Sequence, residues 1–219
     1  KLDFIKFDNP VSHTEGLNTY NATNLKQQSK IGLYLEVGRY TLLSTSKLLS
    51  YIDYGIAYVS EDRKSKGLIL LQNVKQNISL ANLRELAKQS VVNNNEEILV
   101  SRQYKESLNI KTPSIIQKVV NLSGGNQQKV SIAKWLFVKP DILILDEPTR
   151  GIDVGAKFEI YTIMNELVKQ GMSIIMISSE LPEVLGMSDR IYVMSEGKLT
   201  GELASDEATQ ETIMRLATI

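Results

Sequence analysis

Two adjacent carboxylates, Asp146 and Glu147, follow a short apolar run at residues 142–145. A run of this length and composition is typical of a strand buried on both faces of a parallel sheet. Such a strand brings its last residues to the carboxyl edge of the sheet, where open α/β folds bind ligands. At that edge Asp146 can hold Mg²⁺, and Glu147 can orient or deprotonate a water that attacks a phosphate. A plainer alternative is an acidic pair that only ends a strand before Pro148.

A serine and two glycines, Ser123, Gly124 and Gly125, come directly before an amphipathic stretch at residues 126–137. Glycines leave the backbone N–H groups of a helix start accessible, and the helix dipole favours negative charge there. The segment therefore predicts a phosphate-binding surface. The alternative is a simple cap, in which the Ser123 hydroxyl accepts a hydrogen bond from the first turn. A cap alone does not require two glycines, which lower the stability of a first turn.

The elements that must position these residues alternate between strand and helix patterns, which predicts a mostly parallel sheet. After the last parallel strand, a turn at 195–198 leads into another strand, and residues 209–218 look like a short helix. One predicted helix ends at Gly171, and its apolar face carries Val154, Phe158, Tyr161 and Leu167. No strong strand pattern lies within about residues 75–130, which read as a helical insertion. The predicted parallel strands lie at residues 55–59, 141–145, 173–178 and 190–194, with a weaker candidate at 31–35.

Composition narrows the classes of partner. The chain has 25 Lys and Arg against 25 Asp and Glu, and this balance argues against nucleic acid as the main partner. It has no cysteine, which excludes disulfides and thiol chemistry. No run reaches the roughly 18 apolar residues of a membrane helix, and the N-terminus lacks a basic and apolar leader. Any role at a membrane is therefore expected to be peripheral.

Three segments together carry a family resemblance. LSGGNQQKV at 122–130 and ILILDEPTRGIDVGAK at 142–157 resemble the signature and Walker B segments of ABC ATPases. Their particular form is similar to the importers of ribose, galactosides and related monosaccharides. The segment GIAYVSEDRKSKGLILLQNVKQNISL at 55–80 resembles the C-terminal ATPase half of the same proteins. The resemblance extends from about residue 55 to the C-terminus.

The resemblance implies a P-loop NTPase-like ABC ATPase domain that occupies residues 1–219, with a helical subdomain of about residues 75–130 inserted in the α/β core. In this family two domains sandwich ATP head to tail. Ser123, Gly124 and Gly125 would therefore contact the nucleotide of the opposing domain, and Asp153 would lie in the D-loop that touches this partner. Asp146 and Glu147 would serve the nucleotide and Mg²⁺ held by this domain itself.

The resemblance also implies partners and a location. The partners would be a second ABC ATPase domain, fused or separate, the transmembrane permease subunits and, indirectly, a sugar-binding protein outside the cell. No nucleic acid is expected. The domain would be peripheral on the cytoplasmic face of the cell membrane.

Several positions depart from the usual family pattern. Glu61 stands at the Q-loop, where most ABC ATPases carry glutamine, and a carboxylate there can bind Mg²⁺. Ser179 occupies the place of the switch histidine, and a hydroxyl cannot mimic a charged imidazole. No Walker A pattern is present, and only Gly38 and Arg39 match the altered phosphate loop of the second halves of sugar importers. For Arg39 an ordinary solvated side chain is the alternative.

Two functions follow from these residues. The first is an ATPase subunit of a sugar importer, expected to be the degenerate second half of a pair, with Glu147 and Ser179 as candidate catalytic residues. The second is a non-catalytic partner domain that supplies residues 123–125 to a competent half. Glu147 favours the first function, whereas Glu61, Ser179 and the altered phosphate loop favour the second. A DNA-repair or translation ATPase of the same fold would predict basic patches or long coiled insertions, and the sequence has neither.

Overall fold

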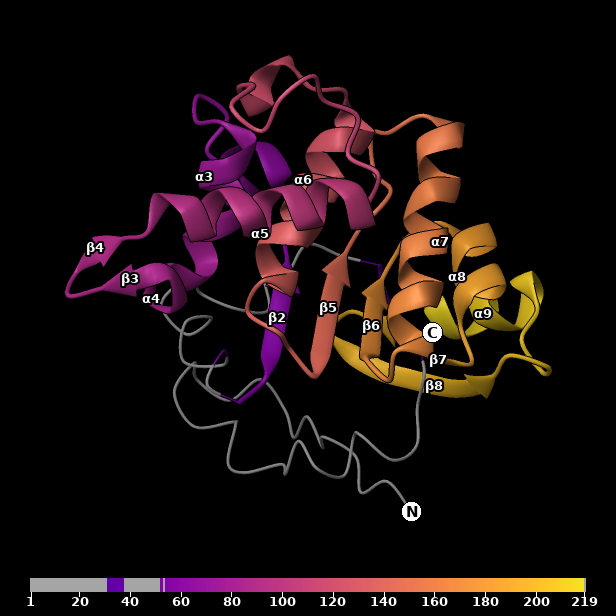
Figure 1. The fold of residues 1–219 in the computed structure, drawn as a ribbon. Coiled ribbons are helices and arrows are strands. Elements are labelled where there is room, and N and C mark those ends of the chain that lie inside the picture. Colours follow the sequence, from indigo (N-terminus) through magenta and orange to yellow (C-terminus); the bar gives the residue numbers. More distant parts are fainter. Residues whose placement is uncertain (1–30, 38–51, 53, 219) are drawn as a thin grey trace.

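The structure is a computed structural model that describes residues 31–37, 52 and 54–218 (Figure 1). Six strands of this part form one sheet in the order β2-β5-β6-β1-β7-β8. Neighbouring strands are parallel, except that β8 pairs antiparallel with β7. Every strand predicted from the sequence is present. The strands are β1 (Ile31–Val37), β2 (Ile56–Val59), β5 (Ile142–Asp146), β6 (Ser173–Ile177), β7 (Arg190–Ser195) and β8 (Lys198–Ala204).

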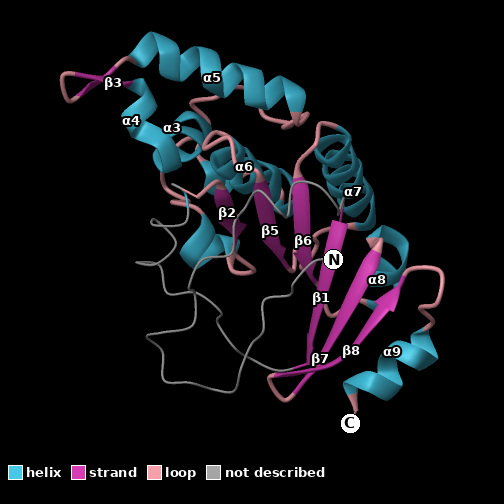
Figure 2. Ribbon diagram, turned by 90° about the horizontal axis from the view of Figure 1, so that it is seen from below, coloured by secondary structure: helices cyan, strands magenta, loops and turns pink. Residues whose placement is uncertain are grey.

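Helices flank this sheet. In Figure 2 helices α5, α6 and α7 lie on one side of the strands, and α9 lies beside β7 and β8 at the far end. In the part of the chain that the structure describes, no helix is long and apolar enough to cross a membrane. The helices are α3 (Val74–Ser79), α4 (Leu83–Leu86), α5 (Asn94–Ser107), α6 (Gly124–Leu136), α7 (Val154–Lys169), α8 (Leu181–Met187) and α9 (Gln210–Ala217), with single turns η1 (Arg63–Gly67), η2 (Leu80–Asn82) and η3 (Val119–Asn121).

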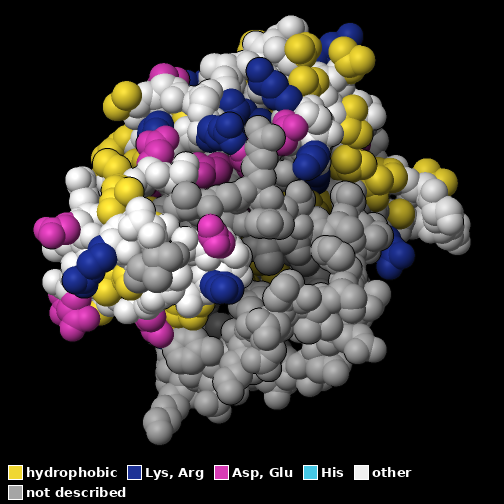
Figure 3. All heavy atoms as spheres, turned by 180° about the vertical axis from the view of Figure 1, so that it is seen from behind, with side chains coloured by type: hydrophobic (Ala, Val, Ile, Leu, Met, Phe, Trp, Pro, Cys, Tyr) yellow, Lys and Arg dark blue, Asp and Glu magenta, His cyan; other side chains and the backbone are white. Residues whose placement is uncertain are grey.

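The chain between β2 and β5 is mainly helical, but it also contains a small hairpin that the sequence analysis did not predict. The hairpin consists of β3 (Ala87–Lys88) and β4 (Val91–Val92), and it projects from the right-hand edge of the molecule seen from behind (Figure 3). Its turn residues Gln89 and Ser90 have φ values of 49° and 65°. A two-residue hairpin turn needs this left-handed backbone, which Asn-Gly or Asp-Gly usually supplies. The sequence analysis missed this hairpin because its turn has neither an Asn-Gly nor an Asp-Gly pair.

The core lies between α6 and the sheet. Val130, Ile132 and Ala133 of α6 and Leu143 and Leu145 of β5 are completely buried in one cluster. Residues 127–134 of α6 are all buried, so this helix is enclosed on more than the side toward the sheet, because α3 and α7 also pack against it. The strand that carries Asp146 and the helix that begins after Ser123 are therefore held rigidly against each other.

The sequence analysis placed Val154 and Phe158 on the buried face of α7, and this prediction is wrong. Val154 and Phe158 are 83% and 72% exposed, whereas Ile160, Met164 and Leu167 are buried. Both sets have helical spacing, so periodicity alone does not separate them. Val154 and Phe158 lie six and two residues before Ile160, which places them about 120° and about 160° around the helix from it. They therefore point away from the buried side of α7.

Candidate functional site

Asp146 is the last residue of β5, as the sequence predicts, and lies at the carboxyl edge of the sheet. The Tyr58 hydroxyl, from the neighbouring strand β2, donates to Asp146 Oδ2 at 2.5 Å. Burial raises the pKa of Asp146, and the Tyr58 hydrogen bond and the charge of Lys66 partly oppose this rise. A half-buried carboxylate of this kind gains most from a cation that replaces its lost hydration.

Glu147 turns sharply away from the strand. Its φ is 45°, a left-handed backbone that is uncommon outside glycine, and its N–H donates to the Ile177 carbonyl at 2.8 Å. Its Oε1 accepts a hydrogen bond from the Ser179 N–H at 2.9 Å. Burial raises the pKa of Glu147, whereas the hydrogen bonds from Ser179 lower it. The two residues predicted to be catalytic are therefore direct neighbours, because β5 and β6 are adjacent and both end here.

A buried carboxylate that the sequence analysis did not single out lies behind this pair. Glu183 of α8 is almost fully buried and accepts a hydrogen bond from the Ser178 hydroxyl. The Glu180 N–H donates in turn to the Ser178 hydroxyl at 3.0 Å. Burial raises the pKa of Glu183. These contacts hold the segment that carries Ser179 in place after β6.

Ser123 caps α6. Its hydroxyl accepts from the Asn126 N–H at 3.4 Å and from the Asn126 side-chain amide at 2.9 Å, so the cap considered above as an alternative is present. The glycines have a packing role as well. A Cβ on Gly125 would lie 2.5 Å from the Ala156 Cβ, and a Cβ on Gly124 would lie 3.1 Å from the Gly151 carbonyl oxygen. Glycine is therefore required where α6 approaches the start of α7, whatever the helix start binds.

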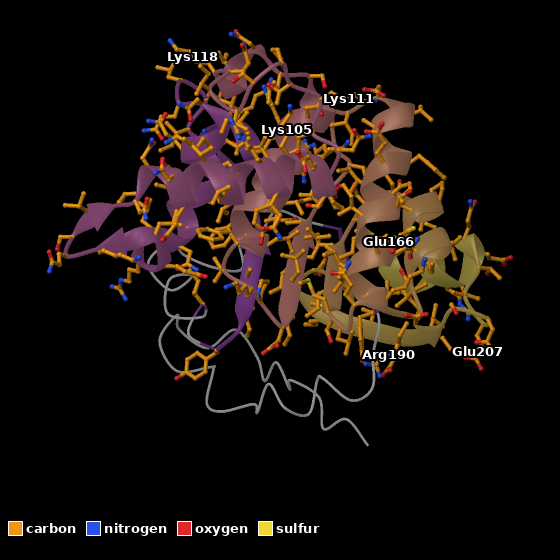
Figure 4. The ribbon with its side chains drawn as sticks, in the orientation of Figure 1. Lys105, Lys111, Lys118, Glu166, Arg190 and Glu207 are labelled. Carbon is orange, nitrogen blue, oxygen red and sulfur yellow. The ribbon has the colours of Figure 1, made fainter. Side chains whose placement is uncertain are left out.

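Asp153 caps α7, because its Oδ1 accepts from the Ala156 N–H at 2.9 Å. The starts of α6 and α7 thus lie side by side, and a hollow of about 220 Å³ separates them. Ser123, Asp153 and Lys111 are among the side chains that line it, and Figure 4 labels Lys111 near the start of α7. The two helix N-termini favour an anion here, whereas the Asp153 and Glu159 carboxylates, which also line the hollow, oppose one, and Lys111 is already paired with Glu159.

Glu61 and Arg63, which follow β2, both contact the loop between β5 and α7. The Glu61 carboxylate forms an ion pair with the Arg150 side chain. Arg63 donates from Nη1 to the Arg150 carbonyl at 2.7 Å and from Nη2 to the Gly151 carbonyl at 3.1 Å. The sequence analysis missed Arg63, because it lies in a charged run in which only burial in the fold distinguishes it from Lys64.

The residues present fit Mg²⁺ only together with a phosphate ligand. The described part of the chain has no group of three or more His, Cys, Asp or Glu side chains that could hold a metal alone. Mg²⁺ typically takes one or two carboxylates and completes its shell with waters and substrate phosphates. Asp146 suits this role, and Glu61 would first have to leave Arg150. Gly38 and Arg39, the predicted phosphate-loop residues, lie outside the described residues.

A parallel sheet with a carboxylate pair at one strand end, together with a serine-glycine helix start that packs against the start of α7, is typical of an ATP-binding cassette domain. The chain belongs to the ABC transporter family, whose model matches residues 43–150, about half of the chain. An L-arabinose transport ATP-binding protein of Geobacillus stearothermophilus is 58% identical over 176 residues, which are 80% of this chain and 34% of that protein. A xylose import ATP-binding protein of Thermoanaerobacter pseudethanolicus is 62% identical over 167 residues, or 76% of this chain and 33% of that protein.

A ribose import ATP-binding protein of Clostridium tetani is 58% identical over 167 residues, which are 76% of this chain and 33% of that protein. The chain thus spans about a third of the length of these relatives. Among solved structures, a dimeric ATP-binding cassette with ADP and phosphate has a TM-score of 0.65 at 17% identity, covering 86% of this chain and 88% of that one. A nucleotide-free cassette from an ABC transporter has a TM-score of 0.66 at 17% identity, over 87% and 85% of the two chains. These structures establish the fold.

Proposed function

We propose that the chain is a nucleotide-binding domain of a sugar ABC importer, which couples ATP binding and hydrolysis to carbohydrate uptake. The observation that supports this most is the contact of Glu147 with Ser179 at 2.9 Å, beside Asp146 at the edge of the sheet. The relatives are named for arabinose, xylose and ribose, which supports a sugar as the cargo without selecting one. The experiment is reconstitution of the chain in its full protein with permease subunits, followed by sugar-dependent ATP hydrolysis.

Each candidate site residue would have its own role in binding or hydrolysing the nucleotide. Asp146 would hold Mg²⁺, which when bound neutralises charge on the phosphates, and Glu147 would orient the attacking water. Arg39 and Gly38 would contact the phosphates of the same nucleotide. Residues 123–125 would present backbone N–H groups to the nucleotide of the opposing domain, and Asp153 would hold the start of α7 beside them.

We further propose that this domain is the supporting half of a pair. Two observations favour that reading: Ser179 has a hydroxyl where the family usually has an imidazole, and Arg150 neutralises the Glu61 carboxylate. The partners would then be a competent ABC ATPase domain, fused or separate, and permease subunits that receive sugar from a binding protein outside. The domain would lie peripherally on the cytoplasmic face of the membrane.

The isolated chain is expected to bind Mg-ATP weakly and to hydrolyse it slowly. Its phosphate loop has an arginine at Arg39 and lacks the lysine and most glycines that wrap phosphates in a Walker A element. Calorimetric titration with Mg-ATP and a phosphate-release assay measure the two properties. Tight binding together with robust turnover by the chain alone would contradict the supporting role.

Glu147→Gln, introduced into this half alone, is expected to lower ATP turnover of the assembled importer by less than about tenfold, because the partner site carries most of the hydrolysis. The measurement is steady-state ATP hydrolysis per assembled complex. The matched control is the same substitution at the equivalent position of the partner half, which should remove nearly all turnover. A complete loss from the change in this half would show that its own site is essential.

A further inference from the structure

Arg63 is an unusual side chain for a buried position. It is 8% exposed, although it begins the single turn η1 directly after the charged pair Glu61-Asp62. Its two terminal nitrogens donate to two consecutive carbonyls, those of Arg150 and Gly151. Its Nε is buried without a hydrogen-bond partner among the described residues. A buried cation with carbonyl acceptors alone is costly, so its presence calls for a gain other than stability.

The guanidinium touches three segments at once. It extends from the chain after β2, binds the loop between β5 and α7 through two hydrogen bonds, and lies against the start of α6. There its Nη2 is 3.1 Å from the position that a Cβ on Gly124 would take. The Glu61–Arg150 ion pair is a second link between the first two of these segments. A planar fork suits this geometry, because its two terminal nitrogens donate in fixed directions and so hold two consecutive carbonyls at a set spacing.

We propose that Arg63 is a positioning residue that holds the loop of residues 150–153 against the start of α6 and thereby aligns both with the nucleotide of the partner domain. This inference rests on the function proposed above, in which residues 123–125 serve that nucleotide. Two effects combine. The fork sets the spacing between Asp153 and Ser123, and the buried positive charge beside Gly124 adds to the field of the helix start.

The test uses the full importer with substitutions in this half only. Arg63→Met removes the fork and the charge while keeping a long side chain, and it is expected to lower kcat for ATP about 100-fold with little change in KM. Arg63→Lys keeps the charge but replaces the rigid two-nitrogen fork by one freely rotating ammonium, so an intermediate loss of about tenfold is expected. Lys64→Met, at the exposed neighbouring position, should leave both constants unchanged.

A purely structural role gives a different pattern. In that case Arg63→Met lowers the melting temperature or the amount of assembled importer, while kcat per assembled complex stays within twofold of the wild type and Arg63→Lys behaves in the same way. That result overturns the inference. Failure of the proposed function is recognised separately, because the unmodified importer would then show no sugar-dependent ATP hydrolysis. An active wild type with an equally active Arg63→Met variant contradicts the role of Arg63 alone.

Discussion

Gly125→Asp in this half alone should reduce ATP turnover of the assembled importer by about 100-fold, the scale seen when a transition-state donor is lost. Two effects are expected. The new carboxylate faces the anion site at the start of α6, and the new Cβ collides with Ala156, whose own Cβ would be 2.5 Å away. The measurement is ATP hydrolysis per assembled complex, after assembly has been verified.

Ala156→Gly separates these two effects. The Gly125→Ala variant should be impaired by crowding alone, and Gly125→Ala with Ala156→Gly should regain most of the activity because the colliding atom is gone. The added glycine costs about 1 kcal/mol of helix stability. Gly125→Asp with Ala156→Gly should stay inactive, since its charge remains. Recovery of wild-type turnover by this last pair would mean that residues 123–125 only pack and do not serve a phosphate.

Glu159→Gln should destabilise the domain by about 2–3 kcal/mol, the largest loss of stability that we expect from a single charge. Lys129 of α6 is 1% exposed, and its Nζ contacts Glu159 Oε2 of α7 at 2.6 Å and the Asn109 carbonyl at 2.8 Å. Removing the carboxylate charge leaves a buried ammonium without a counter-ion. Lys129→Met should cost less, because Glu159 keeps its ion pair with Lys111 at 2.9 Å. Urea unfolding of both variants measures the difference, and a larger loss in Lys129→Met would contradict it.

The same pair predicts a pH dependence. Hydrogen bonds from Lys129 and Lys111 hold the pKa of Glu159 below its usual value. A carboxyl whose pKa is lowered by folding contributes stability above its unfolded pKa and loses it as pH falls through the folded pKa. The stability gap between wild type and Glu159→Gln should therefore be complete at pH 7 and shrink below about pH 4.3, the ordinary pKa of glutamate. A gap that stays constant to pH 3 would show that packing, not charge, causes the loss.

Much of the fold was accessible from the sequence because buried parallel strands have a distinctive composition. The strand that ends at Asp146 is an uninterrupted apolar run, and a run this short predicts a strand rather than a helix. Helix faces were less accessible. Val154 and Phe158 have the spacing of a buried stripe, but they lie on the side of α7 that points away from the buried Ile160. The hairpin turn at Gln89-Ser90 gave no signal, because neither residue is the glycine or asparagine that its backbone favours.

The candidate site shows the same division. Asp146 and Glu147 were predicted because they follow a buried parallel strand, and Ser179 because the family resemblance puts it at the place of the switch histidine. The structure brings the three together because β5 and β6 are neighbours. Arg63 and Glu183 were not, because their importance comes from burial against distant segments. In the sequence each is one charge among several nearby, and nothing local distinguishes it. The sequence also did not predict the close approach of Gly125 to Ala156. Glycines that were assigned to ligand binding are therefore needed for packing as well.

The position of β1 has a consequence for how the chain acquires its structure. It is the earliest of the described strands, yet it lies between β6 and β7, where Ile31 is opposite Ile174 and Gly32 is opposite Arg190. During synthesis β1 therefore has no partner strand until β6 (Ser173–Ile177) and β7 (Arg190–Ser195) have left the ribosome. Pairings this distant in sequence make folding slow, and they leave apolar strands with unpaired edges in the meantime. The domain is thus most vulnerable to aggregation just before its last strands emerge.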